Sequence, residues 1–119
     1  MRSCLKWSNR PVIIYTILFG ILSIFIFAPY YFTDTSLIWQ SDGIAQHFPA
    51  LVHWQEDLKN IVHNHTLPTN WQWQIGLGAD YYQTFSYYTL GDIFSYGAVL
   101  VSKAHLIAYY NWMVIVRLY

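Results

Sequence analysis

The sequence predicts an all-α membrane protein, with an N-terminal transmembrane helix, an extracytoplasmic loop that carries an amphipathic helix, and the start of further membrane helices. Three observations lead to this fold class. Residues 11–32 contain no charged side chain, and the ten residues up to Arg10 contain bases but no acid. Only 10% of the 119 residues are charged, whereas a soluble domain normally carries about a quarter. This composition indicates a lipid environment.

The transmembrane helix is predicted over residues 11–32, PVIIYTILFGILSIFIFAPYYF. At about 1.5 Å per residue, this run forms roughly 33 Å of helix, enough to cross a hydrocarbon core of about 30 Å. A lone segment in lipid must satisfy its own backbone hydrogen bonds, which favours a helix. Pro11 suits a first helical turn, and Tyr30 and Tyr31 suit the aromatic belt at the membrane surface.

The charges at the N-terminus predict the orientation of this helix. Arg2, Lys6 and Arg10 place residues 1–10 in the cytoplasm by the positive-inside rule, and residues 33–88 then lie outside it. The alternative is a cleaved signal peptide, whose apolar region would have about 7–15 residues and end in small side chains. The uncharged run here is longer and ends in the bulky residues 29–32, which favours a membrane anchor. Cys4 is the single cysteine, which excludes an internal disulfide; it is either a plain thiol or a palmitoylation site.

An amphipathic helix is expected over residues 42–63 of the outer loop, where apolar side chains recur near helical spacing. They are Ile44, Phe48, Leu51, Leu58 and Ile61. Asp42 is a plausible N-cap. Pro49 either kinks this helix or begins its longer half at the first turn.

The rest of the chain is expected to return to the membrane. Residues 67–80 contain four turn formers, which disfavours a regular element there. An apolar run at 90–101 is too short to span and suits an interfacial or re-entrant helix. A further helix begins near Ala104 and shows no stop signal at Tyr119. This pattern indicates a chain cut within a membrane helix, and thus a longer native protein.

Few residues in the sequence suggest chemistry by themselves. Asp42, just beyond the membrane exit, is either a general base for an incoming hydroxyl or a helix cap, and the same two interpretations apply to Asp34. The histidines at 47, 53, 63 and 65 lack the spacing of a metal site, so no metal site and no cofactor are predicted. No basic stripe exists, so no nucleic-acid partner is expected.

Five short stretches in residues 42–92 together resemble a known family. They are DGIAQHFP at 42–49, Leu67-Pro68 followed by Trp71, GLGAD at 76–80, Tyr87-Tyr88, and Leu90-Gly91-Asp92. Each stretch is short, but their order after one membrane helix is similar to the start of the bacterial YfhO-type membrane proteins. These proteins belong with the GT-C class of membrane glycosyltransferases.

The resemblance implies a function. Such proteins have about a dozen membrane helices and are thought to move a sugar from a polyprenyl-phosphate carrier to a cell-envelope glycopolymer, such as a teichoic acid, outside the membrane. In GT-C enzymes a carboxylate of the first outer loop acts as catalytic base, and the matching residue here is Asp42. Gln46, Trp71 and Asp80 are expected to shape the substrate pocket, and the fragment alone is expected to be inactive. The alternative is a non-catalytic accessory or transport component whose outer loop binds a partner or a glycan.

Overall fold

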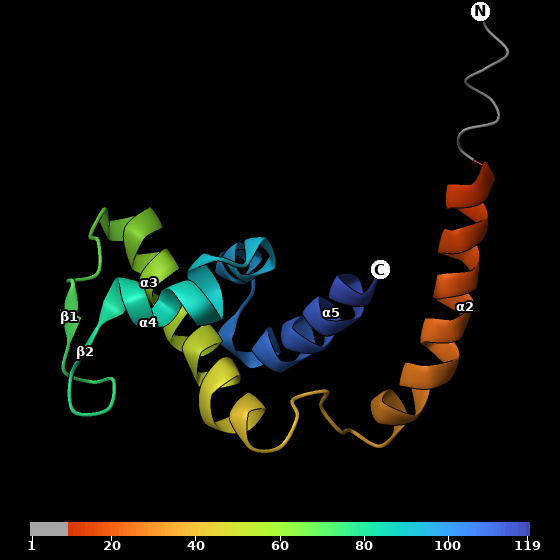
Figure 1. Cartoon of the computed structure of the whole chain (residues 1–119), viewed down its shortest axis with the longest axis horizontal. Coiled ribbons are helices and arrows are strands. Elements are labelled where there is room, and N and C mark those ends of the chain that lie inside the picture. Colours follow the sequence, from red (N-terminus) through yellow and green to blue (C-terminus); the bar gives the residue numbers. More distant parts are fainter. Residues whose placement is uncertain (1–9) are drawn as a thin grey trace, which may run out of the picture.

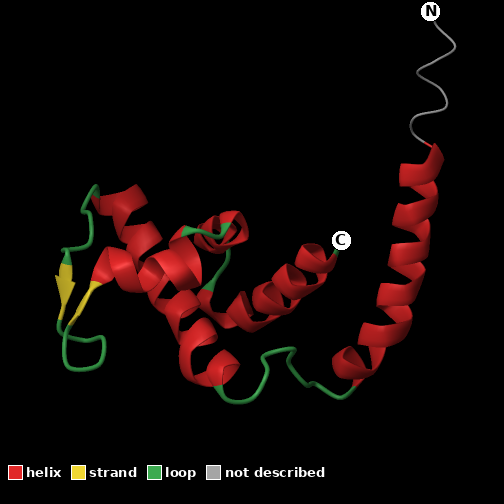
Figure 2. Ribbon diagram, viewed as in Figure 1, coloured by secondary structure: helices red, strands yellow, loops and turns green. Residues whose placement is uncertain are grey.

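The computed structural model describes residues 10–119, so the rest of the predicted basic tail, with Cys4, lies outside the described residues. Helices dominate this part of the chain, as the sequence predicts (Figure 2). A long first helix lies to one side of a group of shorter helices, and a loop over residues 33–41 connects the two (Figure 1).

The first helix, α2 (Arg10–Phe32), coincides with the uncharged run and confirms the predicted helix. It is long and apolar enough to cross a membrane, and none of its residues is buried. Phe25 is 81% exposed and Ile24 is 72% exposed. A continuous exposed apolar surface is unusual on a soluble protein and is expected for a helix that lipid surrounds.

The expected helix at 42–63 is divided into a π-helical turn, η1 (Gly43–His47), and the helix α3 (Phe48–Asn64). Pro49 lies in the first turn of α3, and the backbone at His47 and Phe48 before it is helical, so η1 and α3 form one continuous helical run. A proline ring inside a continuous α-helix clashes with the carbonyl four residues earlier. The wider π turn, in which the Phe48 N–H donates to the Gly43 carbonyl, relieves this conflict.

The segments after α3 are more regular than the sequence suggests. Two-residue strands, β1 (Trp71–Gln72) and β2 (Ala79–Asp80), pair antiparallel within the expected irregular stretch. A short helix, α4 (Tyr81–Phe85), then leads into a second π turn, η2 (Ser86–Leu90).

The predicted helix at 90–101 is a 3₁₀ helix, η3 (Ile93–Leu100). A 3₁₀ turn, η4 (Lys103–His105), then precedes the last helix, α5 (Leu106–Leu118). Helix η3 begins after Asp92, whose backbone is extended and whose carboxylate caps the helix by accepting the Phe94 N–H.

Helix α3 contributes side chains to two apolar clusters. One cluster joins α3 to η3 and α5, and its buried members are Leu51, Ala98, Leu106, Tyr110 and Met113. The other joins α3 to α4, and its buried members are Trp54, Leu58, Tyr81 and Phe85. Leu51 and Leu58 are buried as their spacing predicts, whereas Ile44 is 59% exposed.

Gln55 fastens η3 to α3 through a buried amide. Its Nε2 donates to the carbonyls of Ala98, at 2.9 Å, and Val101, at 2.8 Å. Lys59 Nζ also donates to the Val101 carbonyl, at 3.0 Å. The Ala98 carbonyl also accepts the Val101 N–H, whereas the Val101 carbonyl, beyond the end of η3, is satisfied by the Gln55 and Lys59 side chains.

Helix α5 ends beside the first half of α2. The Tyr15 hydroxyl donates to the Tyr119 carbonyl at 2.9 Å, and Thr16 Oγ1 lies 2.7 Å from the Tyr119 hydroxyl. At the other end of α2, the Leu37 N–H in the following loop donates to Asn111 Oδ1 at 2.8 Å. The two helices therefore run in opposite directions.

Candidate functional site

Asp42 lies at the start of the η1 turn with its carboxylate exposed. No backbone N–H donates to this carboxylate, so the prediction that Asp42 caps the helix through its side chain is wrong. Its Oδ1 instead accepts a hydrogen bond from Gln46 Nε2, at 3.1 Å. This pairing occupies one carboxylate oxygen with an uncharged amide.

Gln46 links Asp42 to a second part of the chain. Its Oε1 accepts a hydrogen bond from the hydroxyl of Tyr88, which comes from the η2 turn. The ring of His47 packs edge-on against Tyr88, with centroids 5.2 Å apart. Asp42, Gln46 and Tyr88 therefore form one hydrogen-bonded chain, and it joins two of the stretches that carry the family resemblance.

A cleft of about 350 Å³ opens beside this chain of hydrogen bonds. Gln46 and Tyr88 line it, and Asp42 lies one hydrogen bond away. The other lining residues come from η1, α3, the β1–β2 connection and α4: Ala45, Pro49, Ala50, His53, Gln74, Ile75, Thr84 and Phe85. The lining mixes apolar carbon with a few amide, hydroxyl and imidazole groups, as ligand sites commonly do.

A second polar cluster includes His53, one of the residues that line the cleft. His53 Nδ1 lies 2.9 Å from Asp57 Oδ2, and the Tyr81 hydroxyl donates to the same oxygen at 2.6 Å. Burial, together with the Asp57 carboxylate, raises the pKa of Tyr81 far above its ordinary value. Tyr81 therefore remains a neutral donor. The i, i+4 spacing of His53 and Asp57 is visible in the sequence, but the contribution of Tyr81 is not.

Trp71 and Asp80 lie opposite each other in the short hairpin, and neither lines the cleft. The side chain of Asp80 accepts the Gln83 N–H at 2.7 Å and so caps α4. The connection between the two strands reaches the cleft through Gln74 and Ile75. In this structure Trp71 and Asp80 therefore lie outside the lining of the cleft.

Replacing Asp80 tests its role as a cap. Asp80→Ala is expected to destabilise the protein by about 1 kcal/mol through loss of the cap, whereas Asp80→Asn keeps an accepting oxygen and costs little. Thermal unfolding of the full-length protein in detergent measures both variants. Equal stability of Asp80→Ala and the wild type would contradict the capping role.

Gly78 is required by the conformation of the hairpin. Its φ is +107°, and an added Cβ would meet the rings of Trp71 and Trp73 at 2.9 Å and 3.0 Å. We expect Gly78→Ala to cost about 1–3 kcal/mol through this backbone strain. The change should also raise the susceptibility of the 71–80 hairpin to limited proteolysis, with Gly20→Ala in the open α2 surface as the control. An unchanged cleavage rate would contradict the expected strain.

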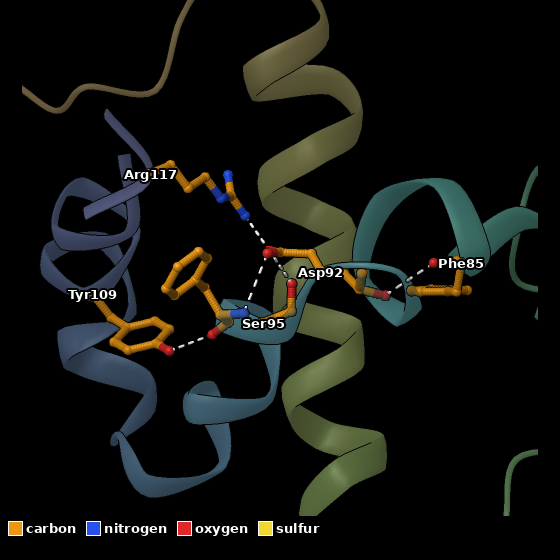
Figure 3. A network of polar contacts seen from close by, with 7 residues as sticks. Phe85, Asp92, Ser95, Tyr109 and Arg117 are labelled. Carbon is orange, nitrogen blue, oxygen red and sulfur yellow. Dashed lines mark hydrogen bonds and ion pairs between the residues drawn. The ribbon is translucent and has the colours of Figure 1, made fainter. Parts of the chain in front are cut away.

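Asp92 connects η3 to α5. Its Oδ2 accepts from Ser95 Oγ at 2.7 Å and pairs with Arg117, and the Tyr109 hydroxyl donates to the Phe94 carbonyl (Figure 3). The sequence stretch that contains Asp92 therefore forms a structural junction. Within residues 10–119, no three histidine, cysteine, aspartate or glutamate side chains gather as a possible metal site.

Comparison with protein families assigns the chain. The family model described as bacterial membrane protein YfhO matches residues 13–119. No curated protein and no solved structure matches the chain. The match includes nearly all of α2 and every element after it, and thus the whole cleft. The chain belongs to the YfhO family of bacterial membrane proteins.

Proposed function

We propose that this chain is the N-terminal part of an integral membrane glycosyltransferase, which transfers a sugar from a polyprenyl-phosphate carrier to a cell-envelope glycopolymer. The observation that carries the proposal is the hydrogen-bonded chain of Asp42, Gln46 and Tyr88 at the edge of an open cleft. It places a carboxylate beside a ligand-sized space, in the segment that follows an apolar helix.

Asp42 is the proposed general base. As the acceptor hydroxyl oxygen attacks the anomeric carbon of the donor, Asp42 takes the hydroxyl proton, and the polyprenyl phosphate leaves with the electron pair of the broken bond. Gln46 holds Oδ1 and is itself held by Tyr88, which leaves Oδ2 for the incoming hydroxyl. A base that is already oriented before the substrate reacts increases the rate of proton transfer, because no freedom of motion has to be lost at that step.

The proposed topology places the N-terminus in the cytoplasm, residues 33–88 outside it, and further spans beyond the first. The opposite directions of α2 and α5 support a chain that leaves the cytoplasmic side and returns. Residues 107–116 of α5 contain no charged side chain, as a membrane segment requires.

Trp71 is a proposed contact for the sugar rings of the donor or acceptor. It is 49% exposed and packs edge-on against Trp73, with centroids 5.7 Å apart. Exposed aromatic faces present apolar area together with a polar N–H, which suits sugar binding. Asp80 is proposed to act indirectly, since it fixes the start of α4 and thus Thr84 and Phe85 in the cleft wall.

Deletion of the gene tests the proposed function. Mass spectrometry of the cell-envelope polymers should show a hexose or amino-sugar mass in the parent strain that is absent after deletion and returns on complementation. Identical envelope spectra in all strains would favour the alternative, a non-catalytic accessory or transport component.

A further inference from the structure

His53 lines the cleft, and one of its two ring nitrogens, Nδ1, is hydrogen-bonded to Asp57. We propose that His53 is a ligand-binding residue of this cleft, and that its Nε2 accepts a hydrogen bond from a hydroxyl group of an uncharged sugar. This inference rests on the proposed function, since it specifies how the sugar would be held and which chemical class the cleft takes.

The hydrogen bonds of Asp57 decide the tautomer of His53. A carboxylate only accepts hydrogen bonds, so its bond to His53 Nδ1, at 2.9 Å, requires the proton to be on Nδ1. In the tautomer with its proton on Nδ1, Nε2 carries the lone pair. Among residues 10–119, none hydrogen-bonds Nε2, and the side chain is 27% exposed where it lines the cleft.

The imidazole ring packs beside two buried aromatic side chains. Tyr81 is fully buried and stacks on Phe85, with centroids 4.5 Å apart, and the His53 ring lies 5.3 Å from Phe85. Tyr81 also donates to Asp57, which fixes the carboxylate that orients His53. A binding group that is ordered before the ligand arrives loses less entropy on binding.

The composition of the cleft selects the class of ligand. None of its lining residues is a carboxylate, a lysine or an arginine. The polar groups are the amides of Gln46 and Gln74, the hydroxyls of Thr84 and Tyr88, and His53, beside the ring of Phe85. Such a lining pairs with a ligand that has many hydroxyl groups and no charge, because a charged ligand would leave its charge without a partner.

Two matched substitutions separate ligand binding from structural support. His53→Asn keeps an N–H near Nδ1, and thus the contact with Asp57, but lacks the reach of Nε2. His53→Gln places an amide oxygen or nitrogen near the position of Nε2. The probes are the methyl glycosides of glucose, galactose and N-acetylglucosamine, and binding to the full-length protein in detergent is measured by saturation-transfer NMR.

We expect His53→Asn to raise the Kd of the preferred glycoside by about 3- to 10-fold, the contribution of one hydrogen bond, and His53→Gln to raise it less. In the wild type, the glycoside should slow carbethoxylation of His53 by diethyl pyrocarbonate, with the exposed His63 and His65 as internal controls. The proposal is overturned if none of the three glycosides protects His53, or if both variants bind the glycoside as the wild type does.

These experiments distinguish failure of the sugar contact at His53 from failure of the proposed transferase function. Glycoside protection of His53 in a protein whose deletion leaves the envelope unchanged would retain the sugar site and reject the transferase. Transfer that depends on Asp42, without any effect of glycosides or substitutions at His53, would reject the sugar contact at His53 alone.

Discussion

Asp42→Asn is expected to lower the rate of sugar transfer by the full-length protein at least about 100-fold, the usual contribution of a general base. Asparagine has the shape of aspartate and still offers Oδ1 to Gln46, so the hydrogen-bonded chain to Tyr88 can persist. Its amide cannot take the hydroxyl proton. The measurement is the initial rate at which labelled sugar enters the envelope polymer in membrane vesicles, normalised to the amount of protein.

Asp34→Asn is the matched control for this prediction. Asp34 lies in the same loop with its side chain exposed, and its φ of +51° is a conformation that asparagine also adopts readily. The control should transfer sugar at the wild-type rate. Equal rates for Asp42→Asn and Asp34→Asn would show that Asp42 is not the base.

Gln55→Glu is expected to destabilise the protein by about 3 kcal/mol at neutral pH, because a buried carboxylate would face carbonyl acceptors. The Lys59 ammonium, which binds the same Val101 carbonyl as Gln55, offsets only part of this cost. Gln55 is 1% exposed, and its Nε2 donates to two carbonyls. A carboxylate there would be buried and could not donate to the two carbonyls, and Lys59 would be its cationic neighbour at this carbonyl pair. Denaturant or thermal unfolding of the full-length protein in detergent measures the loss.

The pH dependence of this variant follows from linkage. Burial raises the pKa of a carboxyl group in the folded state above its unfolded value, so stability is lost as the pH rises through the folded pKa. Below that pH, the protonated carboxyl can donate to one carbonyl. Gln55→Met, of similar length and without charge, should lose about 1–3 kcal/mol at every pH. A loss for Gln55→Glu that does not depend on pH would contradict this account.

The sequence was sufficient to predict the parts of the fold that depend on a single segment. The helix α2 follows from its uncharged run, and the burial of Leu51 and Leu58 follows from their helical spacing. The division of η1 from α3 was less predictable, because Pro49 permits both a kink and a new first turn. Ile44 fits the apolar pattern but lies in the π turn, where its side chain is exposed.

The remaining features depend on contacts between distant segments. Tyr88 reaches Gln46 across 42 positions, and Tyr81 reaches Asp57 across 24. A single sequence gives no information on such pairs when the residues are common surface types. The hairpin between Trp71 and Asp80 contains only two residue pairs, too few for an alternating pattern to indicate strands.

The most direct test of the account is complementation of a gene-deleted strain with either the wild-type gene or Asp42→Asn, followed by mass spectrometry of the envelope polymers. With both proteins present in the membrane in equal amounts, we predict that the sugar mass returns with the wild type and remains absent with Asp42→Asn. If the substituted protein restores the same sugar mass, Asp42 is not the catalytic base and the segment that contains it has a non-catalytic role.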